Sequence, residues 1–224
     1  MGKKNRFERL LYSNGIMVKA IRWSPEIMRK YTIVESAPYC CVAASLESIL
    51  KRHGFNDVSQ YDIANYVGVV VNEQNSDDVP LRLFNVTYTT EHTKVGMHLY
   101  KDTLNDLFKH FGLPFQEFYI SWQELSEWNI DSILQSLSDG DDAIFLFDFG
   151  HLYHEDKNIG IGHSGLFVSI DNNSIIQYLS PGPRFVGFAE FSSEDMLYAI
   201  KARRGGISII YSVSTQIRAQ FWKK

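Results

Sequence analysis

The hydrophobic pattern of the chain changes its period once, near Gly140, and this change limits the possible folds. Before Gly140 the apolar residues follow helical spacing, most clearly over 41–53 and 103–111. After it, the pattern is that of short strands rich in Ile, Val, Phe and Tyr, over 143–149, 164–170, 174–179 and 207–213. Helices followed by an antiparallel sheet predict an α+β fold.

The size and charge of the chain limit its domain organisation and its partners. Its 224 residues, 45% of them hydrophobic, suit a single domain over 1–224. We divide it into a lead-in over 1–35, a mainly helical part over 36–140 and a mainly β part over 141–224. A net charge of -4 without a basic stripe argues against nucleic acid as a partner. No apolar run reaches 18 residues, so we also expect no membrane partner.

The chain has two cysteines, Cys40 and Cys41, and they are neighbours. Adjacent cysteines rarely form a disulfide because the bridge is strained. Free thiols indicate a reducing compartment, so we expect a cytoplasmic protein. Their spacing is also wrong for a structural zinc site, even with His151 and His154 as further ligands. We therefore expect no metal and no cofactor.

Cys41 stands at the start of the best-defined helical pattern. The apolar positions share one face and the pattern ends at Gly54. Unpaired amides and the positive end of the helix dipole favour an anion at this place, which predicts a lowered pKa for the Cys41 thiol. The same amides can stabilise an oxyanion during attack on a carbonyl. The alternative is that Cys40 and Cys41 are simply small buried apolar residues.

The sequence around Cys41 resembles that of a known enzyme family. The stretch 39–46, which reads YCCVAASL, is similar to the active-site stretch of the double-glycine leader peptidases, a bacterial branch of the papain-like superfamily. That family has a nucleophilic Cys, two variable residues, then Ala, a small residue and Leu. This order matches Cys41 followed by Ala44, Ser45 and Leu46, and Cys40 does not fit it. The resemblance implies a papain-like fold with Cys41 as the nucleophile.

His163 fits the second part of the resemblance, which covers roughly 35–68 and 162–181. It stands at the mouth of an apolar strand, directly after Gly162. Papain-like peptidases present their general base in such a Gly-His-apolar strand, and Cys comes before His in their chain order too. The resemblance therefore implies that His163 is the general base. The alternative is a histidine that merely begins a strand.

Ser180 takes the place at which the family has an Asp or Asn that orients the imidazole. A hairpin centred on Asn172 would put Ser180 and Pro181 opposite Ser164 and His163. A serine hydroxyl can accept a hydrogen bond from the ring, but it carries no charge to stabilise imidazolium. Either Asp148 or Asp171 could substitute for it through space, and the sequence leaves this open.

Glu35 is the second departure from the family pattern. The family has a Gln six residues before the nucleophile, and its side-chain N–H contributes to the oxyanion hole. Glu35 stands there in this chain. An ionised carboxylate would repel the oxyanion, and losing such a donor typically costs about 3–4 kcal/mol of transition-state stabilisation.

Two functional hypotheses follow. The first is a cysteine-dependent acyl-transfer enzyme that acts on a peptide, amide or acyl substrate through an acyl-enzyme. Water as second substrate would make it a peptidase or amidase, and an amine would make it an acyltransferase. The second is a degenerate peptidase-like module that binds a peptide or partner protein without cleaving it. Cys41 and His163 favour the enzyme, and Glu35 and Ser180 favour the binding module.

Overall fold

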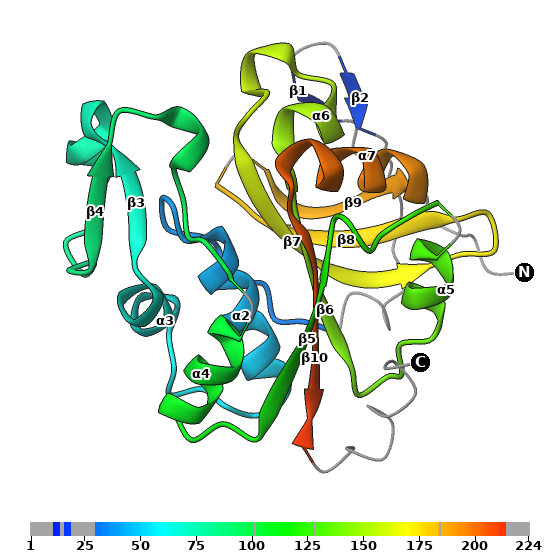
Figure 1. Cartoon of the computed structure of the whole chain (residues 1–224), viewed down its shortest axis with the longest axis horizontal. Coiled ribbons are helices and arrows are strands. Elements are labelled where there is room, and N and C mark those ends of the chain that lie inside the picture. Colours follow the sequence, from blue (N-terminus) through cyan, green and yellow to red (C-terminus); the bar gives the residue numbers. More distant parts are fainter. Residues whose placement is uncertain are drawn as a thin grey trace, which may run out of the picture.

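The computed structural model describes residues 11–13, 16–18, 30–100, 102–127, 129–183 and 185–213. Most of the predicted lead-in lies outside these ranges. At the centre is a six-stranded antiparallel sheet with the order β5-β10-β6-β7-β8-β9 (Figure 1). Its strands are β5 (Phe115–Ser121), β6 (Asp142–Asp148), β7 (Gly162–Ile170), β8 (Ile175–Pro181), β9 (Val186–Ser192) and β10 (Gly206–Ser212).

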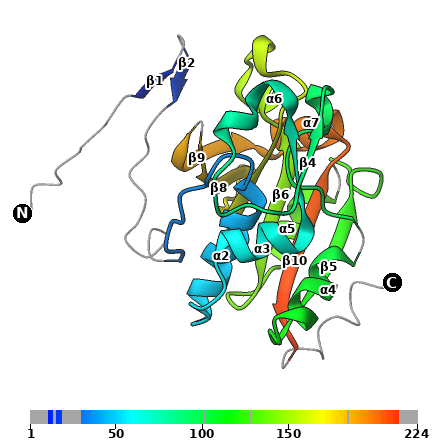
Figure 2. The same cartoon turned by 90° about the vertical axis from the view of Figure 1, so that its left-hand side faces the viewer.

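Three helices and a small sheet lie on one face of the central sheet (Figure 1). The helices are α2 (Cys41–Arg52), α3 (Gln60–Val67) and α4 (Thr103–His110). Beyond α3, the parallel pair β3 (Val69–Asn72) and β4 (Val86–Thr89) forms the small sheet, followed by the 3-10 turn η2 (His92–Lys94). A further 3-10 segment, η1 (Glu73–Asp78), connects the two strands. Figure 2 turns this side toward the viewer and shows α2 and α3 side by side.

The other face of the sheet carries α5 (Ile130–Gln135), α6 (Phe149–Tyr153) and α7 (Ser193–Arg203). The 3-10 turn η3 (Asp156–Asn158) connects α6 to β7, and a separate hairpin joins β1 (Leu11–Ser13) to β2 (Ile16–Val18). This arrangement is α+β, as the change of period predicted. Within the described ranges, no helix is both long enough and apolar enough to span a bilayer.

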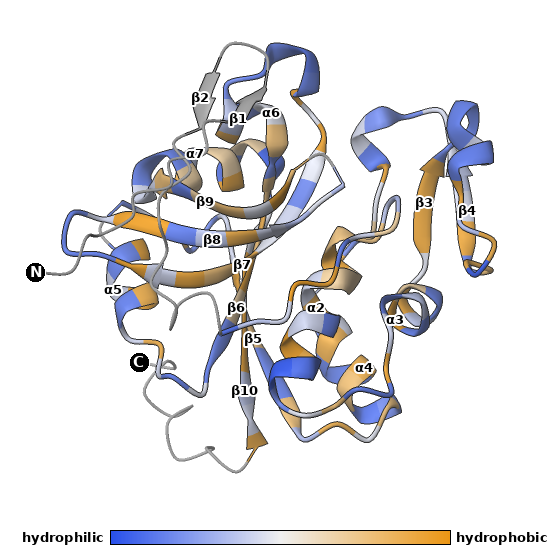
Figure 3. Cartoon of the chain, turned by 180° about the vertical axis from the view of Figure 1, so that it is seen from behind, coloured by the Kyte–Doolittle hydropathy of each residue, from blue (hydrophilic) through white to orange (hydrophobic). Residues whose placement is uncertain are grey.

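The sheet separates two hydrophobic cores because successive residues of a strand point to opposite faces. In β6, for example, Ile144 packs toward α2, whereas Phe145 and Phe147 pack toward α7. All three side chains are fully buried. Figure 3 colours β3 as hydrophobic along most of its length, in keeping with the burial of two of its residues, Val69 and Val71.

The chain ahead of α2 is tied to the sheet by a buried ionic cluster. Asp142, fully buried at the start of β6, accepts hydrogen bonds from the Tyr31 hydroxyl (2.5 Å) and from Arg52, and its second oxygen lies 2.7 Å from His53 Nε2. Lys30 stacks over the Tyr31 ring. The cluster joins the lead-in, the last turn of α2 and the sheet.

Three strand features differ from the sequence prediction. The short pair β3 and β4 and the edge strands β5 and β9 were not predicted. The β7–β8 register is also different, because Leu166 pairs with Leu179 and a bulge follows between Phe167 and Ser169. Continuing that register places Ser180 opposite Gly165, one residue away from the predicted partner.

Candidate active site

A turn sets the position of Cys41 at the start of α2. The Cys40 amide donates to the Ala37 carbonyl (3.0 Å), which closes a turn with Pro38 and Tyr39 at its centre. Pro38 suits the second position of such a turn, whereas Tyr39 has a φ of 68°, which a side chain disfavours by about 1–2 kcal/mol. No side chain caps the beginning of α2, so its first amides point toward the site.

Gln60 holds the segment that leads into this turn. Its Oε1 accepts from the Ala37 amide (2.8 Å) and its Nε2 donates to the Glu35 carbonyl (3.0 Å). Between these two contacts, the Ser36 amide donates to the carbonyl of Pro181 at the end of β8 (2.8 Å). The side chain of Glu35 is exposed. The backbone around Glu35 is therefore fixed to α3 and β8, while its carboxylate faces solvent.

The residue Cys41 is partly exposed, and the pKa of its thiol is raised. Burial raises the pKa, and the Ser164 hydroxyl and amide and the Val42 and Cys41 amides lower it only in part. The predicted lowering of this pKa is therefore wrong for the free protein, because the desolvation of the thiolate outweighs the amides at the helix start. Cys40 is fully buried, and burial followed by the charge of Cys41 raises its pKa to about 12.

His163 is buried at the start of β7. Its ring makes edge-to-face contacts with Phe147 and Phe149, and the ring centroids are 5.5 Å apart in both pairs. Its Nε2 lies 3.0 Å from Ser180 Oγ, which in turn donates its proton to the Phe185 carbonyl (2.6 Å). A hydroxyl has one proton to give, so Ser180 must accept from the ring. This assigns the proton of the neutral imidazole to Nε2 and leaves Nδ1 as the basic nitrogen.

The two carboxylates considered as alternatives to Ser180 are engaged elsewhere. Asp148 caps α6 and lies 2.9 Å from His151 Nδ1, and its other oxygen accepts from the Gly160 amide (2.7 Å). Asp171 closes the β7–β8 turn by accepting from the amides of Asn173 and Ile175. The described hydrogen bonds of His163 therefore include Ser180 and neither of these carboxylates.

Cys41 and His163 line the same pocket, a cavity of about 230 Å³ at the end of the sheet. One wall is formed by the chain from Thr93 to Leu99, and the other by residues of β6, β7 and α7. Ser164, next to His163 in the chain, is the residue whose hydroxyl and amide act on the Cys41 thiol. Thus the structure brings Cys41, His163 and Ser180 together. Glu35 is not among the residues that line the pocket.

Arg203 lines the same pocket and was not predicted as a site residue. It is the last residue of α7. Its side chain donates to the backbone carbonyls of Thr93 and Gly160. Only the tertiary structure shows this contact.

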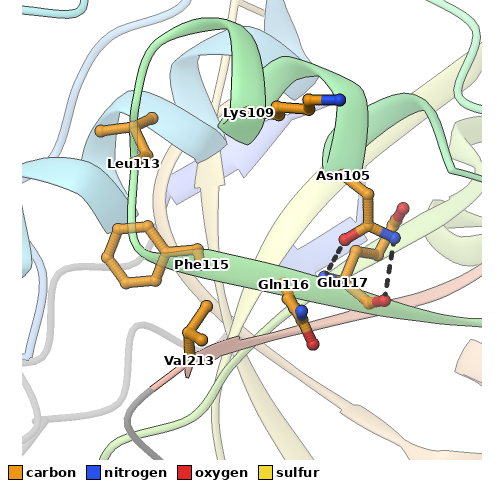
Figure 4. Close-up of a pocket in the computed structure, with 7 residues that line it drawn as sticks. All are labelled: Asn105, Lys109, Leu113, Phe115, Gln116, Glu117 and Val213. Atoms are coloured by element: carbon orange, nitrogen blue, oxygen red, sulfur yellow. Dashed lines mark hydrogen bonds between the residues drawn. The ribbon is translucent and has the colours of Figure 1, made fainter.

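A second pocket, of about 420 Å³, lies between α4 and β5 (Figure 4). Asn105 binds the backbone of Glu117 in both directions, accepting from its amide (2.8 Å) and donating to its carbonyl (3.3 Å). The Glu117 carboxylate is buried, and neither oxygen has a hydrogen-bond partner of ordinary geometry in the described part of the chain. Burial raises the pKa of Glu117 to about 7, and nearby Ser208 offsets this only in part.

Comparison with known proteins supports the papain-like fold. No protein-family model and no curated protein matches the chain. Among solved structures, a candidate C39-like peptidase from Bacillus anthracis matches over 80% of this chain and 93% of its own. The TM-score is 0.51 and the sequence identity is 15%. The two proteins share a fold, that of the papain-like cysteine peptidases, which was the fold implied by the residues around Cys41 and His163.

Proposed function

We propose that the protein is a cysteine-dependent acyl-transfer enzyme that attacks an amide, peptide or thioester carbonyl. Cys41 Sγ is the nucleophile, and Nδ1 of His163 accepts the thiol proton during attack. The free amides at the start of α2 stabilise the oxyanion. The imidazolium then returns the proton to the leaving group, and an acyl group remains as a thioester on Cys41. Water or an amine releases it.

The observation that carries this proposal is the shared pocket of Cys41 and His163, together with the hydrogen bonds that direct Nδ1 of His163 away from Ser180. Because the pKa of the free thiol is raised, the nucleophile is formed by proton transfer to His163 in the bound complex. It is not a thiolate waiting in the free enzyme. Among peptide substrates, the resemblance around Cys41 favours leader peptides that are cleaved after two glycines.

An activated ester tests the proposal directly. p-Nitrophenyl acetate should acylate wild-type protein at Cys41, giving a burst of nitrophenol and a mass increase that hydroxylamine reverses. Cys41→Ala and His163→Ala should lose the burst, whereas Cys40→Ala should keep it, because Cys40 is fully buried. A burst that survives in Cys41→Ala would contradict the assignment of the nucleophile.

The binding module stays the second candidate, because Ser180, which accepts from His163, is uncharged. A module of this kind would bind a peptide in the same pocket and form no acyl-enzyme. Wild-type protein that binds a leader peptide with the same affinity as Cys41→Ala, and that shows no burst with any activated ester, would support this second function over the first.

A further inference from the structure

The pocket beside Cys41 carries positive charge and no negative side chain. Of the residues that line it, the charged ones are Arg203 and Arg204, and the further titratable ones are His98, His163, Tyr119 and Cys41 itself. None of the lining residues is an Asp or a Glu. A cavity with charges of one sign attracts ligands of the opposite sign.

Arg203 is held in place by neutral groups. Its Nη1 donates to the Thr93 carbonyl (2.7 Å) and to the Gly160 carbonyl (3.1 Å). Within the part of the chain that the structure describes, no carboxylate lies within ion-pair distance of the guanidinium. The guanidinium is therefore held by neutral carbonyls, and Asp148 acts on its charge only from beyond ion-pair distance.

The guanidinium lies close to the proposed reaction centre. It packs against Gly162, directly before His163, so tightly that a Cβ at Gly162 would be 2.6 Å from Nε and from Nη2. Burial lowers the pKa of Arg203, whereas the charges of Asp148 and of an ionised Cys41 raise it. Asp148 itself is engaged by His151 and the Gly160 amide. The positive charge of Arg203 thus lies close enough to interact with a negative charge on the sulfur of Cys41.

We infer that the substrate carries a carboxylate near its reactive carbonyl, and that Arg203 binds this carboxylate. This deepens the proposed function and rests on Cys41 as the nucleophile. The substrate class is an acidic acyl compound or peptide, such as a glutamyl or aspartyl derivative or a chain with its terminal carboxylate beside the scissile bond. A partly buried guanidinium with remaining N–H donors suits such a group.

The competing explanation is that Arg203 only fastens the 93–99 segment to the β6–β7 connection. In that case its removal would loosen the pocket for all ligands equally. Binding of a carboxylate predicts instead a selective effect on anions. A ratio between two reagents of similar size and different charge separates the two explanations.

The experiment measures alkylation of Cys41 by iodoacetate, which is anionic, and by iodoacetamide, which is neutral, in a Cys40→Ala background near pH 9. We expect the rate ratio of iodoacetate to iodoacetamide to fall about tenfold in Arg203→Gln. Arg203→Lys, which keeps the charge, should stay close to wild type. The matched control Lys201→Gln removes a cation from the exposed side of the same helix and should leave the ratio unchanged.

A ratio that is the same in wild type and Arg203→Gln would overturn the inference, as would an equal fall in Arg203→Lys. Wild-type protein gives a second measure that needs no folded variant, because the ratio should decline as salt screens the charge. If Cys41 reacts with neither reagent, the proposed nucleophile fails. The carboxylate site is then decided by calorimetry with glutarate, which should bind wild type but not Arg203→Gln, and with glutaramide as the neutral control.

Discussion

His163 Nε2 lies 3.0 Å from Ser180 Oγ, and the only proton of that hydroxyl goes to the Phe185 carbonyl. Ser180 therefore fixes both the orientation and the tautomer of the ring, although it cannot stabilise the imidazolium as a carboxylate would. In the proposed mechanism, Nδ1 is the nitrogen that exchanges the proton with Cys41. In the proposed site, Ser180 therefore orients the imidazole, as the Asp or Asn of the resembling family does, but it carries no charge.

Replacing Ser180 tests this relationship. Ser180→Ala should lower the acylation rate of Cys41 about tenfold, because it removes the bond that orients the ring. Ser180→Asn should retain more activity, since its amide can accept from His163 and donate to Phe185. Burst kinetics measure the rates, and NMR of the imidazole nitrogens measures the tautomer. Equal rates in wild type and Ser180→Ala, with an unchanged tautomer, would contradict a positioning role.

The pH dependence of Cys41 alkylation tests the state of the thiol. Its pKa is raised, so the thiolate fraction should be small at pH 7 and the rate with iodoacetamide should keep rising above pH 9. Ser164→Ala should move this curve to still higher pH, because the Ser164 hydroxyl lowers the thiol pKa. A plateau already reached below pH 8 would show a preformed thiolate, the state that the helix position alone predicts.

The sequence predicted the elements whose pattern is local. Helix α2 and its Cys41 start were predicted correctly, as was the helical spacing that becomes α4. Strand β5 was missed because Glu117 occupies a buried position where an apolar residue would reveal the alternation. The pKa of Cys41 and the role of Arg203 depend on burial and on contacts between segments far apart in the chain. Neither has a local pattern that could have shown it.

Glu117 should make stability depend on pH near neutrality. Its pKa is about 7 in the folded protein, against an ordinary value of 4.5. The folded state thus holds its proton more strongly, and stability is lost as pH rises from about 4.5 through 7. Glu117→Gln should remove this loss and raise the free energy of unfolding at pH 8 by about 1–3 kcal/mol. Urea unfolding of wild type and Glu117→Gln at pH 5 and pH 8 checks this prediction. A substitution effect of equal size at the two pH values would argue against a titrating carboxyl.

Asp142 should have the opposite pH dependence. Burial raises its pKa, but His53, Arg52, Tyr31 and Lys30 outweigh this and lower it below 3.8. Its contribution is therefore present above the unfolded value and lost as pH falls below it. Asp142→Asn should cost about 3 kcal/mol at pH 7, because it leaves the partly buried Arg52 and Lys30 without their anionic partner.

Tyr31→Phe provides the graded control for the Asp142 cluster. It removes one hydrogen bond and no charge, so it should cost about 1 kcal/mol at pH 7. Urea unfolding of the two variants at pH 7 gives the comparison. Costs of equal size in both would mean that the carboxylate charge contributes little, and the cluster would then be held by its hydrogen bonds alone.

Gly162→Ala tests whether the place of Arg203 depends on the empty space beside His163. A Cβ at position 162 would be 2.6 Å from Arg203 Nε and Nη2. The guanidinium is the end of a flexible side chain, so it should move away while the fold is kept. We expect a small change in the free energy of unfolding, below about 1 kcal/mol. The ratio of iodoacetate to iodoacetamide alkylation at Cys41 should fall toward that of Arg203→Gln.

The control for this substitution is Gly140→Ala, where the new Cβ has only an ordinary contact, 3.9 Å from the Ser138 hydroxyl. Gly54→Ala is not suitable, because the φ of 86° at position 54 would strain a side chain. If Gly162→Ala keeps the full preference while Arg203→Gln loses it, the guanidinium acts from another orientation, and the packing against Gly162 has no part in binding the carboxylate.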